Sequence, residues 1–263
     1  MSSENNDYAL SVAQRNEILQ EQAQAPLISG PQILSANPTT CILANDVNSV
    51  PSMAAKLLRI LPRYRAIHYL RRDGSCFYRA AMFGLLSAAV ASDNVLEALL
   101  EICKHTRESI VARFSDYAAD FCDVVEDCLE NIKSNVIRSS VDLHRYVTSP
   151  DNAEYVVFFA RYAVACYLMK HEDDLFPFVA AEHEKYSCMD EFCKGEVEVV
   201  GQDCDHLHIV AFARTFQTAC ALEYLDASAG DAIAHIVGPE DVTPITTVSL
   251  LYRPGHYDLL IPA

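Results

Sequence analysis

Apolar residues recur every three to four positions along most of the chain between residues 51 and 216, a spacing that places them on one face of an α-helix. The clearest stretch is 116–135, where acidic residues occupy the other faces and are expected to face solvent. Asp205 can cap a further helix, because its carboxylate can accept a free backbone N–H. The pattern predicts helices over residues 53–61, 80–91, 95–114, 116–135, 153–169 and 205–216.

Shorter apolar and tyrosine-containing stretches replace the helical pattern near the end of the chain. Residues 219–225, 246–253 and 256–261 have the length and composition of β-strands, and residues 64–70 form an earlier strand-like stretch. A Pro-Gly pair between the last two strands predicts the turn that joins them. Helices followed by late strands indicate an α+β fold, with a helical lobe packed on a mainly antiparallel sheet.

Residues 1–50 differ from the rest of the chain in composition. They contain no lysine and few charges, and Ser, Asn, Gln and Pro occur throughout, with one weak helix-compatible stretch at 8–24. We therefore expect a flexible N-terminal arm over residues 1–50 and one folded domain over residues 51–263. A chain of 263 residues with 51% hydrophobic residues is large enough to bury a sizeable core.

The charge balance is strongly acidic, because 36 Asp and Glu residues outnumber 20 Lys and Arg and give a formal net charge of −16. This excess opposes binding to nucleic-acid phosphates and anionic lipids, so neither partner is expected. The longest apolar stretch, 80–91, is too short to cross a bilayer. A cationic protein partner fits the charge, and a solvated acidic surface without a partner explains it equally well.

The ten cysteines show no C-x-x-C pair, and the chain lacks an N-terminal apolar signal segment. These features predict a reducing compartment, cytosolic or nuclear. We expect no metal site, because the spacing of the nearby candidate ligands matches no common zinc pattern. Those candidates are Cys188, Cys193, Cys204, His206 and His208, of which the two histidines are expected to be packing or surface residues on different helix faces.

Cys76 lies just before the apolar helix predicted from residue 80, in a turn built on Asp-Gly. Free backbone N–H groups and the helix dipole favour a thiolate at such a position. His256 follows the predicted Pro-Gly turn and begins a strand, which is a rigid support for a base. A cysteine taken alone is commonly a buried structural residue. A thiol paired with a distant histidine, however, supplies the nucleophile and the proton carrier that amide or isopeptide hydrolysis requires.

Two acidic residues are candidates for supporting roles at this site. Asp258 lies two positions after His256, so both side chains project from one face of a strand and the carboxylate can orient the imidazole. Asp73 precedes Cys76 in the turn and is better placed to order the backbone donors of an oxyanion loop. We expect Asp258 to be the third member of the triad and Asp73 to support the oxyanion loop.

The two segments that carry these residues resemble those of the otubains, a family of ovarian tumour (OTU) cysteine deubiquitinases. Asp-Gly-x-Cys-Phe-Tyr-Arg-Ala at 73–80 is paired with Leu-Tyr-Arg-Pro-Gly-His-Tyr-Asp at 251–258. The segments at 191–198, 205–211 and 222–226 stand in otubain order, so the resemblance covers about residues 67 to 260. It implies a papain-like OTU fold with Cys76 as nucleophile and His256 as general base and acid. Ser75 departs from the usual Asp-Gly-Asn-Cys motif.

The resemblance also implies a substrate, which is ubiquitin. Val210, Tyr224, Asp226, Tyr252 and Tyr257 match positions with which otubains contact the distal ubiquitin, although packing is the alternative role for such residues. The implied activity is a thiol isopeptidase that cleaves after the C-terminal Gly-Gly of ubiquitin and prefers lysine-48-linked polyubiquitin. It needs no metal or organic cofactor, and a monomer is expected.

Other functions and contacts are compatible with these residues. Some otubains bind ubiquitin-charged conjugating enzymes and block them without catalysis, so those enzymes are further candidate partners. A general papain-like protease for unfolded peptides is a third possibility, which the family-specific motifs and the missing secretory signal disfavour. Glu196 and Glu198 are candidate residues of the cleft, and the arm over residues 1–50 is a candidate contact for the proximal ubiquitin.

Overall fold

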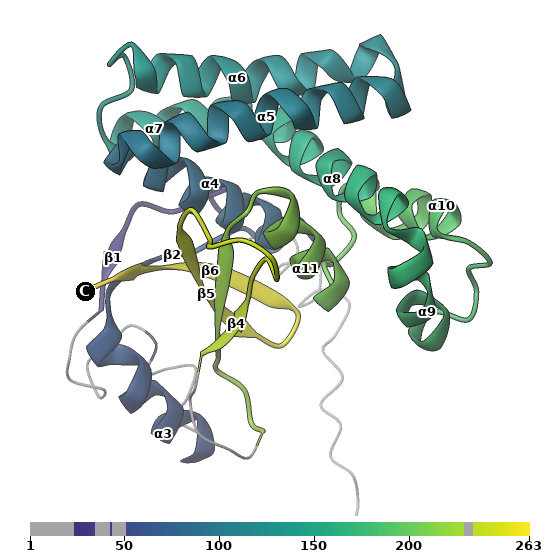
Figure 1. The fold of residues 1–263 in the computed structure, drawn as a ribbon. Coiled ribbons are helices and arrows are strands. Elements are labelled where there is room, and N and C mark those ends of the chain that lie inside the picture. Colours follow the sequence, from purple (N-terminus) through teal and green to yellow (C-terminus); the bar gives the residue numbers. More distant parts are fainter. Residues whose placement is uncertain (1–23, 35–42, 44–50, 229–233) are drawn as a thin grey trace, which may run out of the picture.

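The computed structural model describes residues 24–34, 43, 51–228 and 234–263. Six strands in these residues form one mixed sheet with the order β1-β2-β6-β5-β3-β4, and helices lie around it (Figure 1). The strands are β1 (Gln32–Ile33), β2 (Tyr64–His68), β3 (Ala219–Tyr224), β4 (His235–Val237), β5 (Thr247–Arg253) and β6 (His256–Pro262). This arrangement of helices and strands confirms the predicted α+β class.

Most neighbouring strands are antiparallel, as predicted, but β3 and β5 run parallel. The antiparallel hairpin of β5 and β6 pairs Arg253 with His256 across the two-residue turn. Gly255 in that turn has a φ of +71°, a conformation that glycine adopts without steric cost. The hairpin therefore fixes His256 at the first position of a buried central strand.

The helices occupy the predicted stretches and three further ones. Five follow the apolar pattern closely, α3 (Pro51–Ile60), α5 (Asp93–Phe114), α6 (Ala119–Lys133), α8 (Ala153–Lys170) and α11 (His206–Thr215), while α4 (Cys76–Ala91) begins earlier, at the cysteine. The helices α7 (Ser140–Val147), α9 (Glu172–Glu182) and α10 (Met189–Phe192) are additional. The remaining described elements are two short 3₁₀ helices, η1 (Leu61–Arg63) and η2 (Asp116–Ala118), and the π-helix η3 (Cys193–Val197). No helix in this part of the chain is long and apolar enough to cross a membrane.

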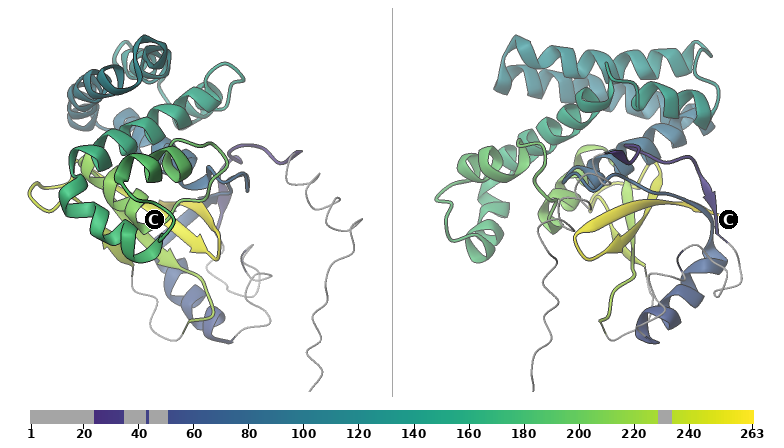
Figure 2. Two further views of the ribbon diagram at one scale, coloured as in Figure 1. Left: turned by 90° about the vertical axis from the view of Figure 1, so that its right-hand side faces the viewer. Right: turned by 180° about the vertical axis from the view of Figure 1, so that it is seen from behind.

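Helix α4 is the centre of the core, because it packs on β5 and β6 and also on α5, α7 and α8. Eleven of its 16 residues are buried, so it is apolar on nearly all sides, as expected for a central helix. Gly84 permits the close approach to the sheet, since a Cβ there would lie 2.6 Å from Cγ1 of Val248. Figure 2 shows α3 and the pair α5 and α6 at opposite ends of the molecule, with the sheet and α4 between them.

The segment before residue 35 differs from the expected arm, because its described residues belong to the sheet. Strand β1 pairs with β2, and the Ser29 N–H donates to the Tyr69 carbonyl over 2.8 Å. Ile28 is 3% exposed and packs into the main core. The folded unit therefore includes residues 24–34, while the helix-compatible stretch at 8–24 lies almost entirely outside the described residues.

We expect Ile28→Ala to lower the free energy of unfolding by about 2–5 kcal/mol, because it leaves a cavity in the core. Ile33→Ala is the matched control, since Ile33 is 83% exposed in the same segment and should change stability by about 0.5 kcal/mol or less. Urea denaturation of both variants measures the difference. Equal, small effects would show that the segment does not contribute to the folded unit.

Candidate active site

Cys76 is the first residue of α4 and lines a cavity. The cavity has a volume of about 250 Å³, and its lining includes Asp203, Cys204 and Tyr257. The side chain of Cys76 is almost buried, and its sulfur accepts the backbone N–H of Tyr257 over 3.4 Å. The start of β6 is therefore held against the thiol, as the paired sequence motifs predicted.

His256 precedes Tyr257 on β6 and is 1% exposed. Its Nε2 atom is 2.9 Å from Oδ1 of Asp258, the two-residue spacing that places both side chains on one face of the strand. Its Nδ1 atom is buried and has no hydrogen-bond partner within the described part of the chain. One ring nitrogen is thus held by a carboxylate, and the other is free to exchange a proton.

Asp258 is fully buried, and three donors surround its carboxylate. These are His256, the backbone N–H of Leu70 at 2.9 Å and the guanidinium of Arg253. Burial by itself raises the pKa of Asp258, but the hydrogen bond from His256 and the charge of Arg253 outweigh it and hold the pKa below its usual value. The carboxylate therefore stays charged and fixes the orientation of the His256 ring.

Asp73 lies in the loop before Cys76, and its hydrogen bonds go to that loop and to α4. Its Oδ1 atom accepts the N–H of Ser75 over 3.0 Å. Its Oδ2 atom accepts Nε and Nη2 of Arg79 over 3.1 and 3.0 Å. The structure therefore places Asp73 as a brace of the loop, and Asp258 is the carboxylate that bonds to His256.

Arg161 on α8 is a buried neighbour of this loop that the sequence reasoning missed. Its side chain is 0% exposed, and its guanidinium lies over the ring of Tyr78, 4.6 Å from the centroid. The guanidinium donates to the carbonyl of Gly74 at 2.9 Å and to Oγ of Ser75 at 3.3 Å. The available signal was a single arginine within the apolar stretch 153–169, where an unpaired charge is costly.

The three tyrosines of the predicted ubiquitin-binding set lie together. The ring centroids of Tyr224 and Tyr252 are 4.9 Å apart, those of Tyr252 and Tyr257 are 5.1 Å apart, and all three rings line the cavity at Cys76. Val210 is half-buried on α11, where its neighbour Ile209 lines the cavity instead. The carboxylate of Asp226 is held by Lys56 at 2.5 Å and by Ser228 at 2.6 Å.

The two glutamates proposed for the cleft bond to other side chains, and of the two candidate histidines only His206 lines the cavity at Cys76. Glu196 accepts hydrogen bonds from Lys185 and Tyr186, and Glu198 pairs with Arg113. Neither glutamate lines the cavity at Cys76, whose acidic residues are Asp203 and Asp205. His208 is buried and His206 is exposed, as expected for residues on different faces of a helix. Within the described ranges, no cluster of three His, Cys, Asp or Glu side chains could hold a metal ion.

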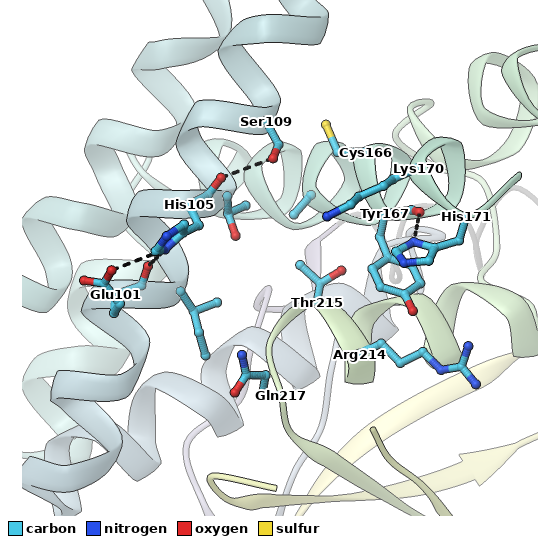
Figure 3. A pocket seen from close by; sticks show the side chains of 13 residues that line it. Glu101, His105, Ser109, Cys166, Tyr167, Lys170, His171, Arg214, Thr215 and Gln217 are labelled. Atoms are coloured by element: carbon cyan, nitrogen blue, oxygen red, sulfur yellow. Dashed lines mark hydrogen bonds and ion pairs between the residues drawn. The ribbon is translucent and has the colours of Figure 1, made fainter. Parts of the chain in front are cut away.

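A second cavity, of about 460 Å³, lies away from Cys76 between α5, α8 and α11 (Figure 3). His105 and His171 lie on opposite sides of it, and the Nδ1 atom of each ring bonds to a helix carbonyl. The hydroxyls of Ser109 and Thr215 also bond to helix carbonyls. Cys166 lines this cavity as well, and burial raises the pKa of its thiol to about 12.

Comparison with known proteins identifies the family. The family model described as Peptidase C65 Otubain matches residues 20–262. Ubiquitin thioesterase OTUB1 of Rattus norvegicus is 31% identical over 252 residues, covering 95% of this chain and 88% of the relative. The ubiquitin thioesterase otubain-like protein of Caenorhabditis elegans is 28% identical and covers 98% of this chain and 93% of the relative.

Solved otubain structures share the fold. The otubain chain in the complex h/ceOTUB1–ubiquitin aldehyde–UBC13~Ub superposes with a TM-score of 0.82 at 26% identity, covering 95% of this chain and 96% of that chain. The corresponding complex with UBCH5B~Ub gives a TM-score of 0.81 with the same coverage. These matches confirm the OTU fold and the resemblance found in the sequence. The chain belongs to the otubain family of peptidases, family C65.

Proposed function

We propose that this protein is a cysteine deubiquitinase that hydrolyses the isopeptide bond after the C-terminal Gly-Gly of ubiquitin. The observation that carries the proposal is the buried pair of His256 and Asp258 at the start of β6, the strand whose Tyr257 N–H touches the Cys76 sulfur. Family membership supports the same reaction, since the relatives are named ubiquitin thioesterases. Ubiquitin and polyubiquitin are the proposed partners.

In the proposed reaction, Cys76, His256 and Asp258 each have one role. Nδ1 of His256 takes the proton of the Cys76 thiol, and the sulfur attacks the carbonyl carbon of the terminal glycine. The carbon–nitrogen bond then breaks, and His256 returns the proton to the leaving lysine amine. Water attacks the thioester with His256 again acting as base, which releases ubiquitin and restores the thiol. Asp258 stabilises the imidazolium at each step.

Burial determines the resting state of the nucleophile. It raises the pKa of the Cys76 thiol to about 11, although the backbone N–H groups of Tyr257 and Phe77 act in the opposite direction. The helix N-terminus was expected to lower the pKa of this thiol, but the increase caused by desolvation is larger. Cys76 remains protonated at neutral pH until His256 accepts the proton, so the general base is essential.

The cavity at Cys76 suits a narrow, flexible peptide that carries positive charge. Tyr224, Tyr252 and Tyr257 offer flat apolar surfaces to a chain that ends in two glycines, and Asp203 is an exposed acid beside them. The tail of ubiquitin, with arginines before Gly-Gly, has this chemistry. Preference for lysine-48-linked chains is part of the proposal, supported by the family resemblance.

A second function is supported by the complexes in which the solved relatives were found. Those otubain chains are bound to ubiquitin aldehyde together with UBC13~Ub or UBCH5B~Ub. We propose that this protein also binds ubiquitin-charged conjugating enzymes. A Cys76→Ala variant, which lacks the proposed nucleophile, should still inhibit ubiquitin conjugation, and this separates binding from hydrolysis. Unimpaired conjugation in the presence of the variant would exclude the second function.

Substitutions at the triad should all lower turnover. Cys76→Ala should abolish hydrolysis of a single-ubiquitin reporter, and His256→Ala should lower kcat by about 10²–10⁴-fold. Asp258→Asn should also lower kcat strongly, because the charge is removed and the amide can hold the imidazole in the wrong tautomer. Cys166→Ala, in the second cavity, is the matched control and should retain the wild-type kcat.

A ubiquitin probe with an electrophilic C-terminus provides an independent check of the nucleophile. Peptide mapping should find the adduct on Cys76 and on no other thiol. Modification of a different cysteine while Cys76 stays free would refute the assignment.

The pH dependence of thiol reactivity tests the link between Cys76 and His256. In His256→Ala, the midpoint for alkylation of Cys76 by iodoacetamide should lie at high pH, because burial raises the thiol pKa and no histidine is present to take the proton. In the wild type, the midpoint should lie at lower pH, because an imidazolium favours the neighbouring thiolate. Identical midpoints in the two proteins would show that His256 does not exchange a proton with the thiol.

Linkage choice and the role of the arm can be measured together on a panel of all diubiquitin linkages. We expect the highest kcat/KM on the lysine-48-linked form.

Removing residues 1–23 should weaken cleavage of diubiquitin and leave cleavage of a single-ubiquitin reporter unchanged, because the proximal ubiquitin lies beyond the scissile bond. Equal rates on all linkages would contradict the proposed preference, and equal loss on both substrates would contradict the proposed role of the arm.

A further inference from the structure

The buried guanidinium of Arg161 joins two loops that are far apart in the sequence. It donates to the carbonyls of Val197 at 3.0 Å and Gln202 at 2.8 Å, in addition to its bonds to Gly74 and Ser75. These acceptors are backbone carbonyls and one hydroxyl, so no carboxylate is among its described hydrogen-bond partners. Keeping a cation in the core without a direct ion pair is costly, which indicates a specific role.

The peptide unit between Gly74 and Ser75 is held at both of its polar ends. Arg161 binds its carbonyl oxygen at 2.9 Å, and Asp73 binds its N–H at 3.0 Å. A peptide fixed in this way cannot rotate. The backbone N–H groups on either side, those of Gly74 and Cys76, donate no hydrogen bond within the described residues. They remain available as donors in the loop that leads into Cys76.

The loop of residues 198–202 packs against the loop of residues 73–75. Gly74 has a φ of +72°, and a Cβ on it would come within 2.1 Å of the carbonyl oxygen of Gly201. The loop of residues 198–202 therefore lies directly against Gly74, and Arg161 anchors both ends of this contact through Val197 and Gln202. A shift of either loop breaks a bond to the same guanidinium.

We propose that Arg161 is a positioning residue that holds the loop of residues 73–75 so that the N–H groups of Gly74 and Cys76 point at the developing oxyanion. The inference rests on the proposed role of Cys76. Its chemical basis is that preorganised donors stabilise the tetrahedral intermediate only if they need not move during the reaction. A planar guanidinium can bond to several acceptors in a fixed geometry, whereas a lysine ammonium on a flexible stem cannot span both loops.

Replacing Arg161 should impair the steps that form an oxyanion and spare those that do not. We expect Arg161→Met to lower kcat on a ubiquitin reporter by about 10²-fold with little change in KM. Affinity for ubiquitin aldehyde, which forms a tetrahedral adduct, should fall in parallel. Alkylation of Cys76 by iodoacetamide, which displaces iodide at a carbon without an oxyanion, should keep its wild-type rate.

Two further variants keep the test decisive. Arg161→Lys retains the charge and should show an intermediate loss of kcat, so it provides the measurement if the methionine variant does not fold. Arg107→Met is the matched control, because Arg107 pairs with Asp123 and Glu126 on the distant helix α6 and should retain the wild-type kcat.

Two results would overturn the inference. One is a wild-type kcat in a folded Arg161 variant, and the other is an equal loss of alkylation and hydrolysis, which would indicate general damage to the site. Neither result would affect the proposed function itself, which fails only if Cys76→Ala remains active or the ubiquitin probe labels another residue.

Discussion

A single buried cation, the guanidinium of Arg161, holds the loop that leads into the proposed nucleophile. Arg161 comes from α8 in the helical layer, and its guanidinium reaches the carbonyls on both sides of the loop contact at Gly74 and Gly201. The cost of burying this charge is offset by its hydrogen bonds to Val197, Gly74, Ser75 and Gln202 and by the ring of Tyr78. The loops before Cys76 and after η3 therefore keep one arrangement relative to each other.

The other half of the site is fixed from the sheet. The β5–β6 hairpin places His256 and Asp258 on one buried face, and Arg253 on the neighbouring strand keeps the carboxylate charged. Leu70, which follows β2, donates a further hydrogen bond to the same carboxylate. The site thus forms where the first residue of α4 meets the first residues of β6. Neither the helical layer nor the sheet contains it alone.

Local sequence patterns predicted the helices and the pairing of His256 with Asp258, but they did not predict contacts between residues far apart in the sequence. The spacing of apolar residues located α5, α6, α8 and α11, and the two-residue spacing of His256 and Asp258 gave their pairing, because both depend only on neighbouring residues. The parallel pairing of β3 with β5, the incorporation of residues 24–34 into the sheet and the bonds of Arg161 depend on residues far apart in the sequence. Composition marked Ile28 as part of an arm, and only its tertiary packing shows it as core.

The central claim is that two clamped loops leave the N–H groups of Gly74 and Cys76 facing the substrate carbonyl. A crystal structure of the wild-type protein joined through Cys76 to ubiquitin aldehyde tests it directly. The account predicts that the adduct oxygen lies about 2.7–3.1 Å from both nitrogen atoms, with the Gly74 carbonyl still bonded to Arg161. An adduct oxygen bonded to other donors, or a Gly74–Ser75 peptide turned away from Arg161, would contradict it.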